Sequence, residues 1–212
     1  MKKIVCLILL LATSVSFSQE AKALLDEVAN KVRSYENMYI EFEHKIDNEE
    51  ANVHQLTNGK ATLQGDLYRF EYMGVEQLFD GNKVYLMVHE DEEIVIKQPN
   101  TEDVTTLTPS KMMTFYEKGF DYEMDIVQNV KGKKMQLVKL TPQNENAELD
   151  YVLVAIEVST KHIHKVIEIG LDGTKTTYTI TKFSTNQSIA DSFFSFDRVG
   201  FEEKGYYITE PK

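Results

Sequence analysis

The feature that most constrains the fold is an alternation of apolar and polar residues that recurs through the second half of the chain. A period of two is typical of β-strands, because successive side chains of a strand point to opposite faces. Short polar turns separate the alternating segments, and strands joined by short turns pair antiparallel. The sequence therefore predicts one long antiparallel sheet. Its expected strands are Tyr122 to Gln128, Lys134 to Thr141, Tyr151 to Val158, His162 to Leu171 and Thr174 to Phe183.

The first half of the chain alternates in the same way between turn signals. Asp80-Gly81 is a strong hairpin signal and predicts a hairpin from Tyr68 to Val88. Asn58-Gly59 predicts a turn into a further strand. The other expected strands are Met38 to Glu43, Lys60 to Gln64 and Glu93 to Lys97.

Two segments follow the helical period instead. The first runs from Ala21 to Tyr35 and is amphipathic. The second runs from Thr108 to Gly119, where Thr108 can cap the helix, Pro109 suits its first position and Gly119 can end it. Helices added to a long antiparallel sheet predict an α+β fold. The apolar stripe of the second helix is Met112, Met113, Phe115 and Tyr116.

The predicted hairpin is unusually apolar. Tyr68, Phe70 and Tyr72 share one face of its first strand, while its second strand, Val84 to Val88, is apolar on both faces. Two explanations remain open for this sheet. Its apolar face can be ordinary core beneath the two helices. Alternatively, the sheet curves into an incomplete barrel that holds an apolar ligand under a helical lid.

Residues 1–18 are expected to be removed as a secretory signal peptide. Two lysines precede a short apolar run, and the run ends at a small-x-small cleavage site, Ser16-Phe17-Ser18, before Gln19. Cys6 is the only cysteine and lies inside this segment, so no disulfide or thiol catalyst is expected in the mature chain. Residues 19–212 are expected to form a single domain.

Charge argues against two classes of partner. Removal of Lys2 and Lys3 takes the formal net charge from −11 to −13. An acidic chain with so few arginines is a poor candidate for binding nucleic acid. Anionic lipid headgroups should repel it as well. We therefore expect a soluble protein that binds no nucleic acid.

The sequence offers no convincing catalytic or metal-binding constellation. His162 and His164 are a possible metal pair, but no third ligand stands near them and exposed strand histidines are favoured. The acidic run from Glu90 to Glu93 lacks the spacing of a calcium loop. No serine lies in a G-x-S-x-G elbow, and no phosphate loop is present. We predict no enzyme activity, no metal and no cofactor.

The order of several segments resembles a known family. After the first helix the sequence reads "YIEFEHKI", "NGKATLQG" and "YRFEYMGVEQLFDGNKVYLM", followed by "TPSKMMTFYEKGFDYEM", "KVIEIGLDGTKTTYTITKF" and "DSFFSFD". This set, from Ala21 to about Asp197, resembles the outer-membrane lipoprotein carrier proteins, the LolA family, in the form common in Bacteroidetes-like bacteria. The resemblance rests on the ordered set and on no single motif.

The resemblance implies an unclosed antiparallel β half-barrel with α-helices packed on its concave face. It implies a periplasmic carrier, expected to be monomeric, that holds the acyl chains of triacylated lipoproteins in an apolar cavity. Such a carrier takes cargo from an inner-membrane ABC lipoprotein-release complex and delivers it to an outer-membrane receptor or to the membrane itself. A lipid- or lipoprotein-sensing regulatory module of related fold is the alternative, and an enzyme acting on envelope lipids is a third hypothesis.

One position departs from the family pattern. Many members have an Arg-Pro pair whose arginine helps to hold the lid, and Gln64-Gly65 occupies its place here. Arg69 is close by but does not align with that arginine. The residues expected to contact acyl chains are Met38, Ile40, Phe42, Leu63, Tyr68, Phe70, Tyr72, Met112, Met113, Phe115 and Tyr116.

Overall fold

The structure, a computed structural model, describes residues 2–99 and 113–210, with side chains from residue 18 onward. Its elements are α1 (Lys2–Arg33), β1 (Met38–Asn48), β2 (Val53–Gln64), β3 (Leu67–Tyr72), β4 (Val75–Phe79), β5 (Val84–Val88), β6 (Glu93–Lys97), the 3-10 helix η1 (Phe115–Glu117), β7 (Phe120–Val130), β8 (Lys133–Pro142), β9 (Leu149–Glu157), β10 (Ile163–Gly170), β11 (Lys175–Thr185), the 3-10 helix η2 (Asp191–Phe194), α3 (Arg198–Glu203) and β12 (Tyr207–Thr209).

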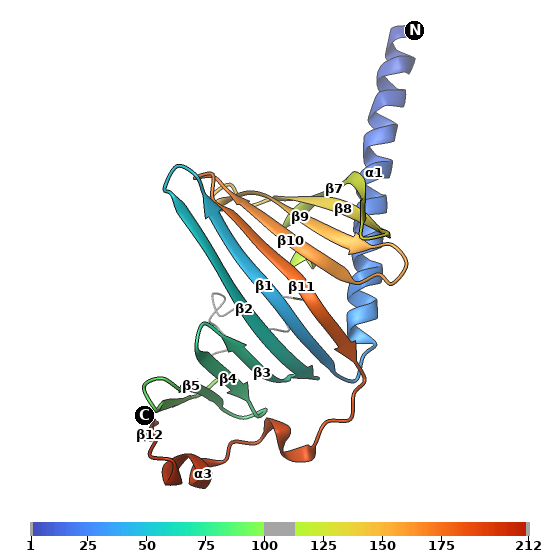
Figure 1. The fold of residues 1–212 in the computed structure, drawn as a ribbon. Coiled ribbons are helices and arrows are strands. Elements are labelled where there is room, and N and C mark those ends of the chain that lie inside the picture. Colours follow the sequence, from blue (N-terminus) through green and yellow to red (C-terminus); the bar gives the residue numbers. More distant parts are fainter. Residues whose placement is uncertain (1, 100–112, 211–212) are drawn as a thin grey trace. The chain divides into compact units, whose positions relative to one another are not determined.

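Twelve strands of the described chain form one sheet (Figure 1). Its order is β12-β6-β5-β4-β3-β2-β1-β11-β10-β9-β8-β7, and it is not closed because β12 and β7 stand at opposite ends. Consecutive strands from β2 to β6 and from β7 to β11 pair antiparallel, whereas β12 pairs parallel with β6. The sheet and its helices confirm the predicted α+β class and the unclosed antiparallel sheet.

The described chain groups into two compact units. The first unit comprises Met1–Ser34, Lys45–Leu56 and Thr114–Thr179, and the second comprises Tyr35–His44, Thr57–Met113 and Ile180–Lys212. The strands β7 to β10 belong to the first unit, and β3 to β6 belong to the second.

In the first unit, α1 packs against β7 and η1 (Figure 1). Leu25 and Val28 lie about one turn apart, so their side chains share one side of α1. Both side chains are buried, which shows that this apolar stripe faces the core of the first unit. On the sheet, Val138 of β8 pairs with Val154 of β9, and both side chains are fully buried. Burying a side chain of this size contributes about 1.5 to 3 kcal/mol, so each of these side chains stabilises the first unit.

Helix α1 begins upstream of the predicted segment and runs without a break through Ser18 and Gln19. It ends at Arg33, close to the predicted end at Tyr35. Among the helices that the structure describes, none combines the length and the apolar character needed to cross a membrane.

One turn was not predicted from the sequence, and with it the strand β4 was missed. Met73 and Gly74 both have positive φ, 51° and 79°, and they join β3 to β4 as a two-residue loop with Tyr72 opposite Val75. A type I′ turn requires positive φ at both central residues. Methionine is not a signal for such a turn, so the sequence concealed β4. Asp80-Gly81 therefore connects β4 to β5, and three strands stand where two were predicted.

The predicted turn at Asn58-Gly59 is wrong, because both residues lie inside β2. The glycine has a packing role, because a Cβ at residue 59 would stand 2.3 Å from Cζ of Phe42. A ring therefore packs directly on the backbone of β2, where only glycine leaves room. The chain turns between β1 and β2 at residues 49–52 instead.

Part of the predicted second helix, residues 108–112, lies outside the described residues. The remainder forms a turn and the short helix η1, so the prediction of an α-helix is wrong for residues 113–119. After η1 the chain is extended at Lys118 and turns through Gly119, with φ 86°, into β7. The five strands predicted after Tyr122 are confirmed as β7 to β11.

Candidate apolar binding face

Strand register in the second unit places a continuous set of apolar residues on one side of the sheet. Residues directly opposite each other in antiparallel strands share a face. Leu63 of β2 lies opposite Tyr68 of β3, Phe70 lies opposite Gln77 of β4, and Gln77 lies opposite Leu86 of β5. We call this side the aromatic face. On β3 to β6 and the end of β2, its apolar residues and Gln77 are Ala61, Leu63, Tyr68, Phe70, Tyr72, Val75, Gln77, Phe79, Val84, Leu86, Val88 and Val95, and the same register places Glu93 and Lys97 at the ends of β6.

Strand β1 extends the aromatic face with a third ring. Phe42 stacks on Phe70 with ring centroids 6.1 Å apart and packs against Tyr72 at 6.0 Å. Met38 and Ile40 alternate with their neighbours so that they share the side of Phe42, and all three are buried. The residues of β1 are thus packed, whereas Phe70 and Tyr72 are only half-buried.

The other side of β3 to β6, which we call the back face, is covered by the C-terminal segment, residues 186–210. Tyr85 and Met87 of β5 are buried here together with Phe194. Tyr85 stacks on Phe196 with centroids 4.2 Å apart. β5 is apolar on both sides because one side contributes to the aromatic face and the other packs against the C-terminal segment.

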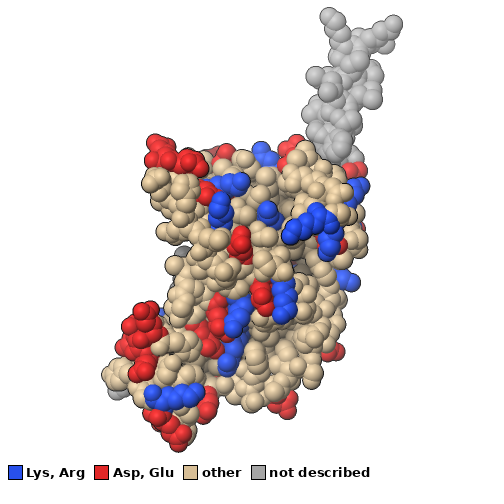
Figure 2. Space-filling model, in the orientation of Figure 1, with Lys and Arg blue, Asp and Glu red and all other residues tan. Residues whose placement is uncertain are grey.

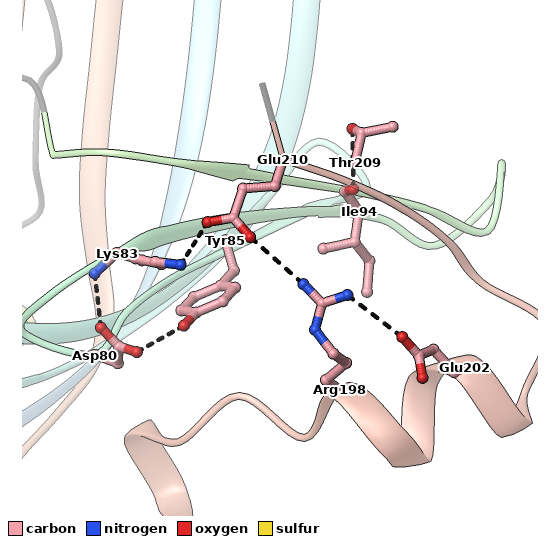
Figure 3. Close-up of polar contacts among 8 residues, drawn as sticks. All are labelled: Asp80, Lys83, Tyr85, Ile94, Arg198, Glu202, Thr209 and Glu210. Atoms are coloured by element: carbon pink, nitrogen blue, oxygen red, sulfur yellow. Dashed lines mark hydrogen bonds and ion pairs between the residues drawn. The ribbon is translucent and has the colours of Figure 1, made fainter. Parts of the chain in front are cut away.

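Polar contacts fix the end of the C-terminal segment to β5 and β6 (Figure 3). Glu210 pairs with Lys83 and, at 3.7 Å, with Arg198. The hydroxyl of Tyr85 donates to Asp80 at 2.7 Å. Burial, together with that hydrogen bond, raises the pKa of Tyr85 to about 12, so the hydroxyl stays protonated at neutral pH. These contacts hold the C-terminal segment in place as part of the second unit.

Arg69 also belongs to the back face. Its guanidinium pairs with Glu76 at 3.1 Å and lies 5.0 Å from the ring centroid of Phe193. Glu76 also accepts from Nε2 of His89 at 2.9 Å. Arg69 therefore contacts the C-terminal segment and faces away from Tyr68 and Phe70.

Four residues supply uncharged polar atoms to the aromatic face, whereas the charged Glu93 and Lys97 lie exposed at the two ends of β6. Nε2 of Gln77 donates to the hydroxyl oxygen of Tyr68 at 2.8 Å, and Nδ1 of His44 bonds the hydroxyl of Tyr72. Burial raises the pKa of both tyrosines and lowers the pKa of His44. Each of these groups therefore keeps its neutral form, which suits an apolar ligand.

Charged side chains of β1 to β3 point to the back face instead. Lys60 pairs with Glu71 at 2.9 Å, and Lys182 of β11 pairs with Glu41 at 3.2 Å. Figure 2 shows Lys and Arg interspersed with Asp and Glu on the surface in view. In β1 to β3, the side opposite the aromatic face thus carries paired charged side chains, while the aromatic face carries apolar ones.

The structure brings together seven of the eleven residues expected to contact acyl chains. They are Met38, Ile40, Phe42, Leu63, Tyr68, Phe70 and Tyr72, all on the aromatic face. Met112 lies outside the described residues. Tyr116 is 0% exposed, and its helix η1 packs against α1 in the first unit. Gln77 and Phe79 of the unrecognised strand β4, and Leu86 of β5, also lie on the aromatic face and were not among the expected residues.

The strand histidines are half-buried and not exposed. Burial lowers the pKa of both His162 and His164. Residues 2–99 and 113–210 contain no group of three or more His, Cys, Asp or Glu side chains placed to hold a metal ion.

Comparison with known proteins agrees with the fold. A family model described as "Outer membrane lipoprotein carrier protein LolA" matches residues 33–197. A search of curated proteins by sequence found no match. An uncharacterized conserved protein from Thermus thermophilus aligns over 91% of this chain and 99% of its own, with a TM-score of 0.60 and 8% identity.

Two further solved structures are similar. LprF from Mycobacterium bovis aligns over 82% of this chain and 97% of its own, with a TM-score of 0.53 and 11% identity. A LolA superfamily protein from Nitrosomonas europaea aligns over 83% and 97%, with a TM-score of 0.41 and 10% identity. At such low identity, the likeness to the Thermus and Mycobacterium proteins shows the fold alone.

Proposed function

Because the chain belongs to the LolA family of outer membrane lipoprotein carrier proteins, we propose that it binds lipoproteins by their acyl chains and carries them through the periplasm. The aromatic face is the proposed acyl-chain site. The fold and the family support binding or sorting of lipoproteins, and the carrier role is our extension of that.

One observation carries the proposal. The second unit has two apolar sheet faces, and the chain covers the back face with its own C-terminal segment. On the aromatic face, Phe70, Tyr72 and Leu86 stay half-buried. A soluble protein rarely leaves a large contiguous apolar surface without a ligand or partner. An acyl chain fits such a surface, since its contacts need neither charge nor hydrogen bonds.

The energetics explain why a carrier is needed. Each methylene that leaves an apolar environment for water costs about 0.8 kcal/mol. A chain of about sixteen carbons therefore costs about 12 kcal/mol to expose. Contacts with rings and aliphatic side chains offset that cost while the lipoprotein crosses an aqueous compartment.

The proposed route follows from the proposed cargo. After cleavage of residues 1–18 the mature protein acts in the periplasm. It receives triacylated lipoproteins from an inner-membrane ABC lipoprotein-release complex and releases them to an outer-membrane receptor or to the membrane. No cofactor and no catalytic step enter this proposal.

Isolation from envelope extract, followed by mass spectrometry, tests the proposal. A carrier should retain several lipoproteins in substoichiometric amounts. A single membrane protein in place of lipoproteins would identify a sensing module, and turnover of added envelope lipid would identify an enzyme. Either of these results would contradict the carrier role.

A further inference from the structure

The hydrogen-bonded pair of Tyr68 and Gln77 is not explained by an acyl-chain site alone. Gln77 lies between Phe70 of β3 and Leu86 of β5 on the aromatic face. An amide among rings and aliphatic side chains costs free energy unless its hydrogen bonds are made. A leucine at this position would serve an acyl chain better. The amide therefore requires a separate reason.

The side chains of the pair keep hydrogen-bonding groups available. Among the described residues, neither side chain makes a hydrogen bond other than the 2.8 Å bond between Nε2 of Gln77 and the hydroxyl oxygen of Tyr68. Gln77 uses one of its two N–H groups in that bond, so its Oε1 can accept, while its second N–H and the O–H of Tyr68 can donate. Turning the Gln77 amide over, so that the O–H of Tyr68 donates to Oε1, again leaves both a donor and an acceptor available.

A hydrogen-bond donor next to a hydrogen-bond acceptor can bind the C=O and the N–H of a single residue in an extended peptide. In antiparallel strands, the N–H and C=O of the same residue point to the same side and bond one partner residue together. An N-acylated amino acid presents these two groups directly next to its acyl chain. A diacylglycerol or a fatty acid has no N–H to offer.

We propose that Tyr68 and Gln77 bind the N-acyl amide of an acylated amino acid, so that the aromatic face prefers N-acylated amphiphiles to ester lipids. This inference rests on the proposed function, since it requires an acyl chain on the aromatic face. The acylated amino terminus of a triacylated lipoprotein and a free N-acyl amino acid share this chemistry.

Two ligands that differ by a single group test the proposal. They are N-palmitoylglycine methyl ester and its depsi analogue, in which an ester oxygen replaces the amide N–H. Displacement of a fluorescent fatty acid from the mature chain, which contains no tryptophan, measures both affinities. The unaltered protein should bind the amide about three- to tenfold more tightly, the effect of one hydrogen bond.

The double variant Tyr68→Phe with Gln77→Met should bind both ligands equally. Both partners become apolar and keep similar shapes, so neither is left with an unpaired polar group. The matched control is Gln55→Met, at an exposed position of β2, which should keep the preference for the amide. Thermal melts of both variants accompany the binding measurements.

Affinities within twofold of each other in the unaltered protein would overturn the inference, and this comparison does not depend on any variant folding. The proposed function would survive that result, because both chains are bound. Failure of both ligands to displace the probe would instead contradict the proposed function, and the inference with it. A synthetic triacylated lipopeptide that binds more tightly than the N-acylglycine ester assigns the site to lipoproteins; the reverse order assigns it to free N-acyl amino acids.

Discussion

Phe70 and Glu71 are neighbours in β3 whose side chains face opposite sides of the sheet. Phe70→Asp places a charge on the aromatic face, where an acyl chain cannot solvate it. We expect it to weaken binding of an apolar probe at least tenfold, equivalent to about 1.4 kcal/mol. Glu71→Lys changes a charge on the back face and should leave binding within twofold. Probe titrations of both variants measure this.

Equal losses in the two variants would argue against a binding site on the aromatic face. Thermal melts must accompany the titrations, because Phe70 packs on Phe42. A large drop in the melting temperature of Phe70→Asp alone would favour the explanation that this face is ordinary core.

Asp80, in the turn between β4 and β5, is expected to make the stability of the folded protein depend on pH under acidic conditions. Burial by itself raises the pKa of Asp80, but the backbone amides of Lys83 and Asn82 and the hydroxyl of Tyr85 donate to it and hold the pKa below its usual 3.8. The folded state then binds fewer protons than the unfolded state near that pH. The stabilisation is therefore present above about pH 4 and is lost as the pH falls through the folded pKa.

Melting temperatures measured from pH 7 to pH 2 check this. The unaltered protein should lose stability below pH 4 more steeply than Asp80→Asn, in which the titrating group is absent. Parallel curves for the two proteins would show that Asp80 does not contribute.

Among the elements, η2, α3 and β12 of the C-terminal segment were not predicted from the sequence. Phe194 of η2 belongs to the buried cluster of the back face, whereas Val199 of α3 is 64% exposed. Phe194→Ala should reduce the free energy of unfolding by about 3 to 5 kcal/mol because it opens a cavity. Val199→Ala, the control, should change it by less than about 0.5 kcal/mol. Denaturant unfolding measures both.

Probe affinity under native conditions should be unchanged in Phe194→Ala, because Phe194 packs on the back face. A loss of affinity in a variant that remains folded would show that the two faces are coupled, which the present account does not predict.

Strands with clear alternation were predictable, and the exceptions have physical causes. β6 and the strands from β7 to β11 follow a period of two between polar turns, and the structure confirms them. β4 was hidden because its entry turn uses Met73, a residue that rarely has positive φ. The glycine of Asn58-Gly59 serves the packing of Phe42, a long-range contact that no local pattern reveals.

The sequence predicted which residues of β3 share the face of the candidate site, but not how many further residues lie on that face. The alternation of Tyr68, Phe70 and Tyr72 correctly grouped them with Leu63 of the neighbouring strand. Alternation could not tell which side the C-terminal segment would cover, since that depends on contacts between residues more than 100 positions apart, such as Lys83 with Glu210. Gln77 entered the site only once β4 was known.

At the scale of the whole molecule, the proposed processing sets the residue at which the mature chain begins. The small-x-small site at Ser16-Phe17-Ser18 predicts a mature chain that begins at Gln19 or within two residues of it. Intact-mass measurement of the protein isolated from its native envelope determines the start. An acyl adduct on Cys6, or retention of residues 1–18, would contradict the prediction.

The central claim is that acyl chains of lipoproteins lie on the aromatic face. Photo-crosslinking tests it most directly, with Phe70→benzoylphenylalanine as the probe and Glu71→benzoylphenylalanine as the matched control on the back face. After irradiation in intact cells, mass spectrometry of the adducts should find lipoproteins joined through their acyl chains at position 70 and none at position 71. Lipoprotein adducts at both positions, or at neither, would contradict the account.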